Sequence, residues 1–557
     1  MEIGISRPNS SRTNGVFSLG WRGLLLAITA LLAVPMLVIF SNLGQPFSPA
    51  WRHLFDTVLQ DYVVNSLVLM FGVGAGTFIL GVGTAWLTAM CDFPGRKFLS
   101  WAFLLPLSMP AYIIAYTYTG ILDFSGPVQT SLRNIFGWQF GEYYFPEIRS
   151  LGGAIWMLSL VLYPYVYMLV RVAFLEQSTA VLEASRTLGR KPWATFFLVA
   201  LPLARPAIVA GVSLALMETL ADYGTVAYFG VSAFTTGIFR TWYGLGELTT
   251  AAQLCAFLMI FVLTLIVAER WSRQRLRFHK TSAQKKLVRI KLKGWRASLA
   301  TVLSIAVILC GFAIPAAQLL IWSLNHWQQS IDNGFLTLLF NSFSLAATAA
   351  ICCLALAILF TYARRVSKSR AELSAINVAS LGYAVPGTVI AIGVIIPFAW
   401  LDNQIDFFSR AWFDHSTGLI FSGTIGILVF AYLVRFLSVA LNTVGSGLNS
   451  IKPCIDESAR SLGARGSQVV SRVHLPILRT SLLTALLLVF VEVLKELPTT
   501  LILRPFNFNT LAVRTYELAS DERLMDAALP ALSIVIIGLL PILVITKSIL
   551  NERPKNA

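Results

Sequence analysis

The chain has 557 residues, of which 56% are hydrophobic and only 13% are charged. This balance is typical of proteins that span membranes, and it excludes an ordinary water-soluble enzyme or binding module. The formal net charge of +16 does not indicate a nucleic-acid site, because membrane proteins concentrate Lys and Arg in their cytoplasmic loops.

Apolar runs follow one another along almost the whole chain. A polar segment, 1–20, precedes the first run at 24–40, which we expect to be a retained helix because no clear signal-peptide cleavage site follows it. Eleven further runs of spanning length lie at 62–90, 99–120, 152–174, 204–226, 250–268, 298–323, 340–362, 376–399, 418–441, 479–501 and 527–547. The pattern predicts an all-α polytopic membrane protein with about twelve transmembrane helices.

Basic segments set the expected orientation. The loops 91–98 and 364–370 are basic, and the segment 270–296 carries eleven Lys or Arg residues. With a cytoplasmic N-terminus, all three segments fall on the cytoplasmic side, as the positive-inside bias requires. We therefore expect a multi-pass membrane protein, in contact with lipid, with both termini in the cytoplasm.

A polar stretch between apolar runs occurs twice. The first copy is Leu-Glu-Ala-Ser-Arg-Thr-Leu-Gly at 182–189, and the second is Asp-Glu-Ser-Ala-Arg-Ser-Leu-Gly at 456–463. Each is followed thirteen residues after its glycine by a proline, Pro202 or Pro476. Since six predicted helices separate the copies, both lie on one side of the membrane, and the chain is predicted to contain two parallel repeats.

The repeat register extends well beyond these stretches. An offset of 276 pairs Asn65-Ser66 with Asn341-Ser342 and Pro110 with Pro386. An offset of 274, without a gap over about sixty residues, pairs Glu183 with Glu457, Arg186 with Arg460, Gly189 with Gly463, Pro202 with Pro476, Arg205 with Arg479, Glu218 with Glu492, Thr225 with Thr499, Thr236 with Thr510, Arg240 with Arg514 and Thr241 with Thr515.

These patterns divide the chain into five parts. We predict a cytoplasmic tail (1–20), a first repeat (21–269, polar stretch 182–202), a basic cytoplasmic linker (270–296), a second repeat (297–548, polar stretch 456–476) and a C-terminal cytoplasmic tail (549–557). The linker is interpreted as a solvated hinge facing lipid headgroups, in preference to a dedicated regulatory site.

Each polar stretch is predicted to form a helix–turn–helix bracket on the cytoplasmic surface. In the first copy Glu183 and Arg186 lie one helical turn apart. Gly189 ends that helix, because glycine readily adopts the left-handed conformation of a helix C-terminus. A second helix from Trp193 to Leu201 leads through Pro202 into the membrane.

The two brackets resemble the EAA loop of permease subunits of bacterial ATP-binding-cassette (ABC) importers. In that family the loop docks in a groove of the ATPase subunit and passes its motion to the membrane helices, and the fold implied is that of a type I importer permease. The second copy departs by having Val470 where the first has the aromatic Phe196. We therefore expect the two loops to bind the ATPase with unequal strength. The resemblance implies ATPase-coupling roles for Glu183, Ala184, Arg186, Gly189, Pro202, Glu457, Ser458, Arg460, Gly463 and Pro476.

The chain contains no Gly-x-x-x-x-Gly-Lys-Ser/Thr phosphate loop, so we expect no ATP site and no cofactor in it. The resemblance places ATP and Mg²⁺ on a separate cytoplasmic ATPase, and two brackets imply two ATPase copies. The chain is thus expected to be a transport subunit and not an enzyme. The rival class is an ion-coupled secondary transporter, which would have no need for matched docking brackets.

The whole chain also resembles the fused permeases of ferric-iron importers, which receive iron from a periplasmic or lipid-anchored binding protein. The similarity is clearest at 221–225, 234–241, 495–499, 503–506, 511–514 and 527–530. Thiamine permeases share the two-loop plan and polyamine permeases share the helix arrangement, so both substrates remain alternatives. We expect the binding protein to dock on the extracytoplasmic loops 120–150, 227–249 and 502–526.

Four carboxylates lie in or at the ends of two predicted spans. Glu218 and Asp222 are four residues apart, on one predicted helix face, and Glu492 and Glu496 repeat the arrangement. Charged groups inside a span usually face a polar path, and hard cations prefer oxygen ligands. We expect the four to line a translocation path, with Fe³⁺ transiently at Glu218 and Glu492 and no metal held stably. The alternative is that Lys495 or nearby arginines neutralise some of them as structural ion pairs.

Overall fold

The computed structural model describes residues 19–139, 141–177, 185, 187–189, 192–274, 289–331, 333–367, 369–464 and 466–551. Within these ranges the chain is almost entirely helical, with one two-stranded sheet. Among the same residues, ten helices are long and apolar enough to cross a membrane, or eleven if one bent pair counts as a single span. The predicted all-α membrane fold is therefore confirmed.

Each of the twelve predicted apolar runs overlaps a helix. The third run is the bent pair, Arg96–Ser108 with Ala111–Phe136, whose parts meet at 94°, and the last run contains a shorter apolar helix, Ala528–Val544. The ninth run is displaced: it was expected at 376–399, whereas the long helix begins at Gly387. Pro386 precedes that helix in an extended conformation, because proline has no N–H to donate and fits poorly inside a helix.

The helices of the two predicted repeats follow the same order. The first part of the chain forms α1 (Leu19–Ser41), η2 (Asn42–Gly44), α2 (Pro49–Thr57), α3 (Leu59–Met90), β1 (Cys91–Asp92), α4 (Arg96–Ala102), η3 (Leu105–Ser108), α5 (Ala111–Leu122), α6 (Pro127–Phe136), α7 (Leu151–Glu176), α9 (Pro192–Thr195), η4 (Phe196–Ala200), α10 (Leu201–Ala221), α11 (Gly224–Tyr228), α12 (Phe234–Phe239), η5 (Arg240–Gly244) and α13 (Leu248–Gln274). The second part forms β2 (Ile290–Lys291), α14 (Trp295–Ile308), η6 (Leu309–Ala313), α15 (Ile314–Ser330), α16 (Asn333–Val366), α17 (Arg370–Ala379), η7 (Gly382–Ala384), α18 (Gly387–Phe413), α19 (Ile425–Asn449), α20 (Pro453–Ser461), α21 (Gly466–Gln468), η8 (Val469–His474), α22 (Leu475–Lys495), α23 (Pro498–Leu503), α24 (Leu511–Ser520) and α25 (Ala528–Asn551).

Equivalent positions of the repeats have equivalent structural roles. Pro202 and Pro476 are both the second residue of their helices, and α10 and α22 have the same length of 21 residues. Pro110 and Pro386 are both N-caps, of α5 and α18, with almost the same backbone angles. The sequence offsets of 274 and 276 are thus confirmed at these points.

The register changes before α12 and α24. The amide of Asn65 donates to the carbonyl of Ser232, and the amide of Asn341 donates to the carbonyl of Asn509. In the same way, Ser66 Oγ accepts from the backbone N–H of Phe234, and Ser342 Oγ accepts from that of Leu511. Ser232 and Phe234 thus correspond to Asn509 and Leu511 at an offset of 277. Their partners on α3 and α16 correspond at an offset of 276. The prediction of an ungapped offset of 274 is therefore wrong at the starts of these two helices.

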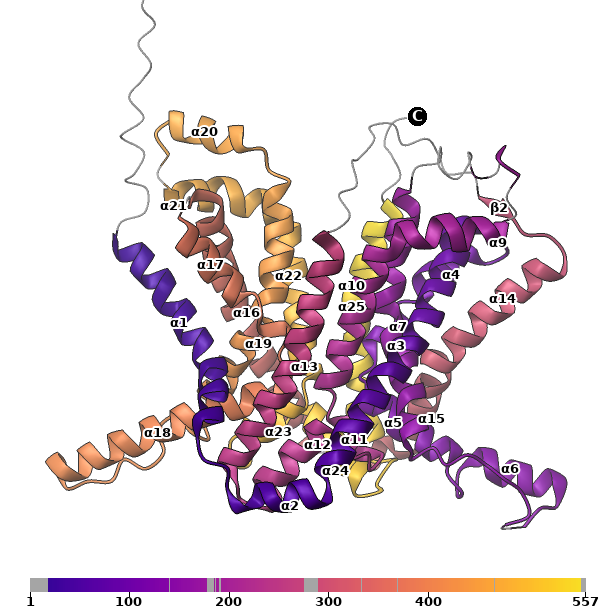
Figure 1. Ribbon diagram of the computed structural model, residues 1–557, viewed down its shortest axis with the longest axis horizontal. Helices are drawn as coiled ribbons and strands as arrows, with labels where there is room; N and C mark the ends of the chain where they lie inside the picture. Colours follow the sequence, from indigo (N-terminus) through magenta and orange to yellow (C-terminus); the bar gives the residue numbers. More distant parts are fainter. Residues whose placement is uncertain are drawn as a thin grey trace, which may run out of the picture.

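The first helices of the two repeats are exchanged. Helix α1 packs against α17 and α18 of the second repeat, and α14 and α15 pack with η6 against α4, α5 and α7 of the first (Figure 1). Arg22 of α1 forms an ion pair with the buried Glu372 of α17 at 3.2 Å. Tyr118 of α5 donates a hydrogen bond to the carbonyl of Cys310 in η6 at 2.6 Å. Packing thus crosses the predicted repeat boundaries, which remain a prediction from the sequence.

The end of the basic linker is anchored to the first repeat. Strand β2 pairs in parallel with β1, with Ile290 opposite Cys91 and Lys291 opposite Asp92. Arg289 also donates to the carbonyl of Ala89 at 3.3 Å. The predicted solvated hinge therefore does not include these residues, and the segment 275–288 lies outside the described residues.

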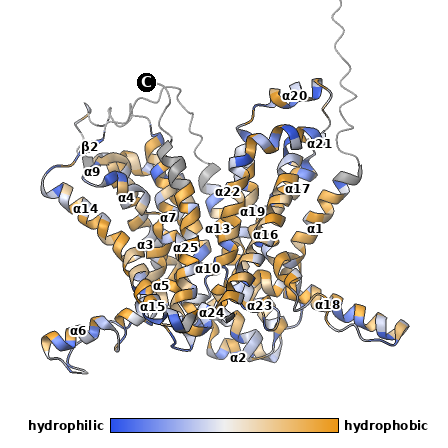
Figure 2. Ribbon diagram, turned by 180° about the vertical axis from the view of Figure 1, so that it is seen from behind, coloured by the Kyte–Doolittle hydropathy of each residue, from blue (hydrophilic) through white to orange (hydrophobic). Residues whose placement is uncertain are grey.

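Helices α9 and α20, which belong to the two polar stretches, lie at the same end of the molecule (Figure 1). We call the two polar stretches, 182–202 and 456–476, the first and second handles, and this end of the molecule the handle end. Strand β2 and helix α17 lie there too, as predicted for basic segments on one face, and the two halves diverge toward it. At the opposite end α6 and the last part of α18 project away from the other helices. Hydrophobic residues dominate the helices between the ends (Figure 2), which agrees with a parallel repeat in a bilayer.

The close approach of η7 to α19 makes Gly382 a sensitive position. A Cβ atom there would lie 1.7 Å from the backbone carbonyl oxygen of Val434, so Gly382→Ala must displace one of two packed helices. We expect it to lower the free energy of unfolding by roughly 1–3 kcal/mol. The matched control is Gly445→Ala within α19, where a Cβ would meet only a methyl group at 3.9 Å. Thermal unfolding in detergent should separate the two variants, and equal midpoints would contradict this packing.

Candidate functional site

Helix α10 ends one residue before Asp222, and the short helix α11 begins two residues after it, at Gly224. Asp222 is the C-cap of α10, and its carboxylate accepts hydrogen bonds from the backbone N–H groups of Thr225 (3.0 Å) and Val226 (3.1 Å). It also accepts one from Thr225 Oγ1 at 3.0 Å. A carboxylate at this place satisfies the free N–H groups at the start of α11. The prediction that Glu218 and Asp222 share one helix face is therefore wrong.

The second repeat has the same break. Glu496 is the C-cap of α22, and its Oε1 accepts from the backbone N–H of Thr499 at 3.0 Å. The same oxygen is 3.0 Å from Nη1 of Arg435, a residue of α19, and both side chains are buried. Asp222 and Glu496 are thus equivalent residues whose carboxylates accept hydrogen bonds from the start of a short helix, α11 or α23, and Glu496 is neutralised by an arginine.

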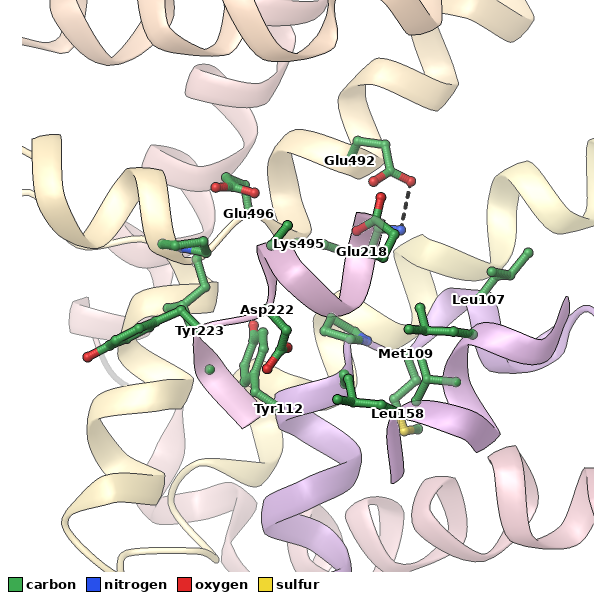
Figure 3. A pocket seen from close by; sticks show the side chains of 18 of the residues that line it. Leu107, Met109, Tyr112, Leu158, Glu218, Asp222, Tyr223, Glu492, Lys495 and Glu496 are labelled. Carbon is green, nitrogen blue, oxygen red and sulfur yellow. Dashed lines mark hydrogen bonds and ion pairs between the residues drawn. The ribbon is translucent and has the colours of Figure 1, made fainter. Parts of the chain in front are cut away.

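Glu218 and Glu492 lie one turn before these breaks. Glu492 Oε1 forms an ion pair with Nζ of Lys495 at 2.8 Å. In the part of the chain that the structure describes, Glu218 has no ion pair within 4.0 Å, although it lies beside the Glu492–Lys495 pair (Figure 3). The expected alternative of structural ion pairs therefore holds for Glu492 and Glu496, and not for Glu218.

All four predicted carboxylates line one cavity between the repeats (Figure 3). Its volume is about 130 Å³, enough for a few water molecules or a hydrated ion. Arg435 and Lys495 also line it, so the wall carries two more carboxylates than cations. Such a wall can attract a cation and give it oxygen ligands in succession.

Arg435 was not predicted from the sequence, although a signal was present. It is the sole Asp, Glu, Lys or Arg of the apolar run 418–441, and an isolated charge inside a span is a functional candidate by default. The other cavity residues that were missed are aromatic or apolar and carry no such signal. They include Met109, Tyr112, Leu158, Tyr165 and Tyr223.

No group of three His, Cys, Asp or Glu side chains in the described ranges is arranged to hold a metal ion. Within the cavity, Asp222 and Glu496 have part of their oxygen lone pairs committed to helix starts. Glu218 and Glu492 are the carboxylates whose oxygens are least committed to such contacts. Their oxygens are therefore more available to a passing cation than those of Asp222 and Glu496.

The second handle has the predicted helix and turn. Gly463 has φ +83°, and after α20 the N–H of Gly463 bonds to the carbonyl of Arg460 and that of Ala464 to the carbonyl of Ala459. This pair of bonds is the Schellman arrangement that ends helices at a left-handed glycine. Glu457, Ser458 and Arg460 are exposed on α20, so their side chains are accessible to a partner.

The first handle is described only in part. Gly189 is exposed and has φ +76°, which matches Gly463. Ser185 Oγ lies 3.0 Å from Thr195 Oγ1, and the two hydroxyls join the limbs of the bracket. The predicted coupling residues Glu183, Ala184 and Arg186 lie outside the described residues.

Each handle continues directly into a membrane helix. The segments Trp193–Ala221 and Gly466–Lys495 are single helices of 29 and 30 residues, each widened at one turn, η4 or η8. The second limb of each bracket and the helix that carries Glu218 or Glu492 are therefore one continuous element. The surface helix predicted from Trp193 to Leu201 is too short, because the helix continues without a break to Ala221.

The handles are fixed to the molecule by different contacts. In the first, Phe196 packs on Trp86, with ring centroids 4.7 Å apart. In the second, Asp456 is buried between Nε of Arg365 at 2.6 Å and Nε2 of His474 at 2.9 Å. Burial alone would raise the pKa of Asp456, but the hydrogen bonds from His474 and Arg365 hold the pKa below its ordinary value. This charged anchor was not predicted from the sequence.

We expect Asp456→Asn to lower the free energy of unfolding by roughly 3–5 kcal/mol near neutral pH, because Arg365 would lose its buried partner. The matched control is the exposed neighbour, Glu457→Gln, which should leave thermal stability unchanged. The stabilisation from Asp456 is present above the ordinary Asp pKa and is lost as the pH falls through the lower folded-state pKa. The unfolding midpoints of variant and wild type should therefore converge in acid, and a gap that persists there would contradict the assignment.

Comparison with known proteins agrees with this geometry. The family described as binding-protein-dependent transport system inner membrane component matches twice, at residues 78–277 and 354–552. The Fe(3+)-transport system permease protein FbpB 2 of Haemophilus influenzae is 24% identical over 95% of this chain and 98% of its own length. The ferric transport system permease protein FbpB of Actinobacillus pleuropneumoniae is 23% identical over 84% of this chain and 69% of its own. The molybdenum transport system permease protein ModB of Escherichia coli is 29% identical over 41% of this chain and 96% of its own length.

Proposed function

The chain belongs to the family of binding-protein-dependent transport system inner membrane components, and we propose that it carries ferric iron across the bacterial inner membrane. It is the permease of an ABC importer, with both family repeats in one chain. The observation that carries the iron proposal is the cavity, where carboxylates from both repeats outnumber cations by two. The relative that matches almost end to end is named as a Fe(3+) transport permease, which supports the same substrate.

The proposed partners follow from the two ends of the molecule. Two copies of a cytoplasmic ATPase bind the two handles at the handle end, and ATP and Mg²⁺ reside on those subunits. A periplasmic or lipid-anchored binding protein delivers iron at the opposite end. There Arg149, before α7, joins Glu522, after α24, through two close contacts of 2.7 and 3.0 Å, so both repeats contribute to the surface.

The proposed mechanism uses the continuity between handle and cavity. When the ATPases close on ATP, they draw the handles together, and α10 and α22 move with them. Glu218 and Glu492 lie on these helices, so the same motion changes the cavity between the repeats.

The charge of the cavity wall separates anionic substrates from cationic ones. The molybdenum permease relative raises the possibility of an oxyanion, but a wall with excess carboxylates repels anions. Thiamine and polyamines are cations, so charge alone does not separate them from iron. An ion-coupled secondary transporter is disfavoured by the family match.

The proposal is tested by transport in proteoliposomes that contain the chain, its ATPase and its binding protein. Ferric iron, thiamine, a polyamine and molybdate are offered in turn, with and without internal ATP at the handle side. We expect accumulation of iron alone, and only with ATP. Accumulation of another substrate in place of iron would overturn the iron proposal, and uptake without ATP would overturn the proposed coupling to an ATPase.

A further inference from the structure

The cavity breaks the repeat symmetry in its cations, because Arg435 and Lys495 take the places of Val161 and Ala221, 274 positions earlier. Glu218 and Glu492 are equivalent, and so are Asp222 and Glu496, so both repeats supply two carboxylates. The last residue of α10 is Ala221, whereas the last residue of α22, 274 positions later, is Lys495. Both residues line the cavity. The second repeat thus supplies both cations of the cavity.

The two cations of the cavity differ in freedom. Arg435 is buried with Glu496, and its guanidinium is confined, because a Cβ on Gly387 would lie 2.1 Å from its Nη1. It also lies over the ring of Phe436, with its Cζ 5.4 Å from the ring centroid. Lys495 keeps 17% of its side chain exposed, and its partner Glu492 keeps 27%. A lysine ammonium on a flexible stem can leave its partner more easily than a packed guanidinium can.

The place of the ammonium is also the place where a cation would bind. Nζ of Lys495 lies 2.8 Å from Glu492 Oε1, and Glu218 lies beside this pair (Figure 3). The ammonium therefore occupies the region between the two least committed carboxylates. A transported ion must bind strongly enough to enter a site and weakly enough to leave it, and a trivalent ion among unopposed carboxylates would leave slowly.

We propose that Lys495 is a tethered counter-ion of the cavity: its ammonium pairs with Glu492 between passages and is displaced when a metal cation binds there. This inference rests on the proposed function and adds to it the residue that sets how weakly the cation is held. Between passages the ammonium balances a carboxylate that would otherwise attract small cations from either side. On arrival of the metal it withdraws, and its repulsion then favours release.

The test measures binding of Tb³⁺, a trivalent cation that prefers oxygen ligands, to the full chain in lipid nanodiscs by Tb³⁺ luminescence. We expect Lys495→Ala to bind Tb³⁺ about tenfold more tightly or better, and to release it more slowly, because a repelling unit charge is gone. Lys495→Arg keeps the charge and should retain weak binding. The double variant Ala221→Lys/Lys495→Ala moves the lysine to the equivalent position, three residues after Glu218, and should restore weak binding.

Unchanged or weaker Tb³⁺ binding by folded Lys495→Ala protein would overturn the inference, and so would a folded double variant that binds as tightly as Lys495→Ala. Thermal unfolding establishes folding in each case. A separate arm offers ferric citrate in place of Tb³⁺. If Lys495→Ala loses binding of ferric citrate and leaves that of Tb³⁺ unchanged, the lysine holds an accompanying anion and the counter-ion role is wrong.

The failure of this inference is distinguishable from that of the proposed function. Glu218→Gln with Glu492→Gln should abolish Tb³⁺ binding if the carboxylates bind the cation. Should Tb³⁺ binding be indifferent to these carboxylates, the proposed cation path itself fails. Should it depend on them but not on Lys495, the path stands and the tethered counter-ion alone is refuted.

Discussion

Iron uptake should fall at least about tenfold when Glu218 and Glu492 are both replaced by Gln, while ATP hydrolysis by the assembled importer continues. Each substitution keeps the size of the side chain and removes one charge from the cavity wall. One charge contact at 4 Å is worth about 4 kcal/mol at the effective dielectric typical of protein sites, and 1.4 kcal/mol already corresponds to tenfold. We expect Glu218→Gln alone to have the larger single effect, because Glu492 is already paired with Lys495.

The measurement is initial uptake of radioactive iron by proteoliposomes, with ATP hydrolysis followed in parallel. Asp61→Asn is the matched control, since Asp61 is an exposed carboxylate of α3 that does not line the cavity. It should transport like the wild type. Uptake by the double variant equal to that of the control would remove the carboxylates from the path and leave them a structural role.

Replacing Gly189 and Gly463 by Val should release the ATPase from the membrane chain. Both glycines have positive φ, where a residue other than glycine costs about 1–2 kcal/mol and a β-branched one more. Among the described residues, nothing lies within 4 Å of a Cβ at either position, so we expect the bulk of the side chain to be felt mainly by the docked partner. We expect at least about tenfold less ATPase retained on purified membranes, and ATP-driven uptake should be lost with it.

Gly137→Val is the matched control for the handles. Gly137 also has positive φ, at 70°, and also has nothing within 4 Å of a Cβ, but it follows α6 at the opposite end. It should keep the ATPase at the wild-type level. If Gly137→Val loses as much ATPase as the handle variants, the loss reflects general instability. If the handle variants keep their ATPase, the stretches are ordinary connectors.

The helical architecture could be predicted because its signal is local. A run such as 62–90 is too apolar and too long to be anything but a span, and helix α3 follows it closely. The two handles could be found because one motif occurs twice at a fixed offset. The predicted helix end is confirmed at Gly463, because its positive φ and the hydrogen bonds after α20 are those of a helix-ending glycine.

The exchange of first helices could not be predicted, because it depends on contacts between distant parts of the chain. The pair Arg22–Glu372 joins residues 350 positions apart, and neither residue has a local signal that names the other. The charged anchor around Asp456 is of the same kind. Arg365 and His474 come from different elements, and their meeting is set by how α16 packs on α19 and α22.

The carboxylates of the candidate cavity could be predicted from the sequence, but their arrangement could not. A charge in an apolar span is visible in the sequence, which identified Glu218 and Glu492. The end of α10 at Ala221 was not visible, because it depends on Asp222 bonding to the N–H groups of Thr225 and Val226 in preference to continuing the helix. The C-cap of α22 at Glu496 is of the same kind, so Asp222 and Glu496 bond to the starts of short helices, whereas Glu218 and Glu492 do not.

We infer that each handle and its side of the cavity move as one helix. Spin labels at positions 205 and 479, exposed equivalents near the starts of α10 and α22, report on that motion in a cysteine-free background. The decisive measurement is the distance between the labels by pulsed electron paramagnetic resonance in the reconstituted importer, without nucleotide and with trapped ATP. We expect a shorter distance with ATP, because closure of the ATPases draws both helices together. A distance that stays the same while ATP is bound would contradict it.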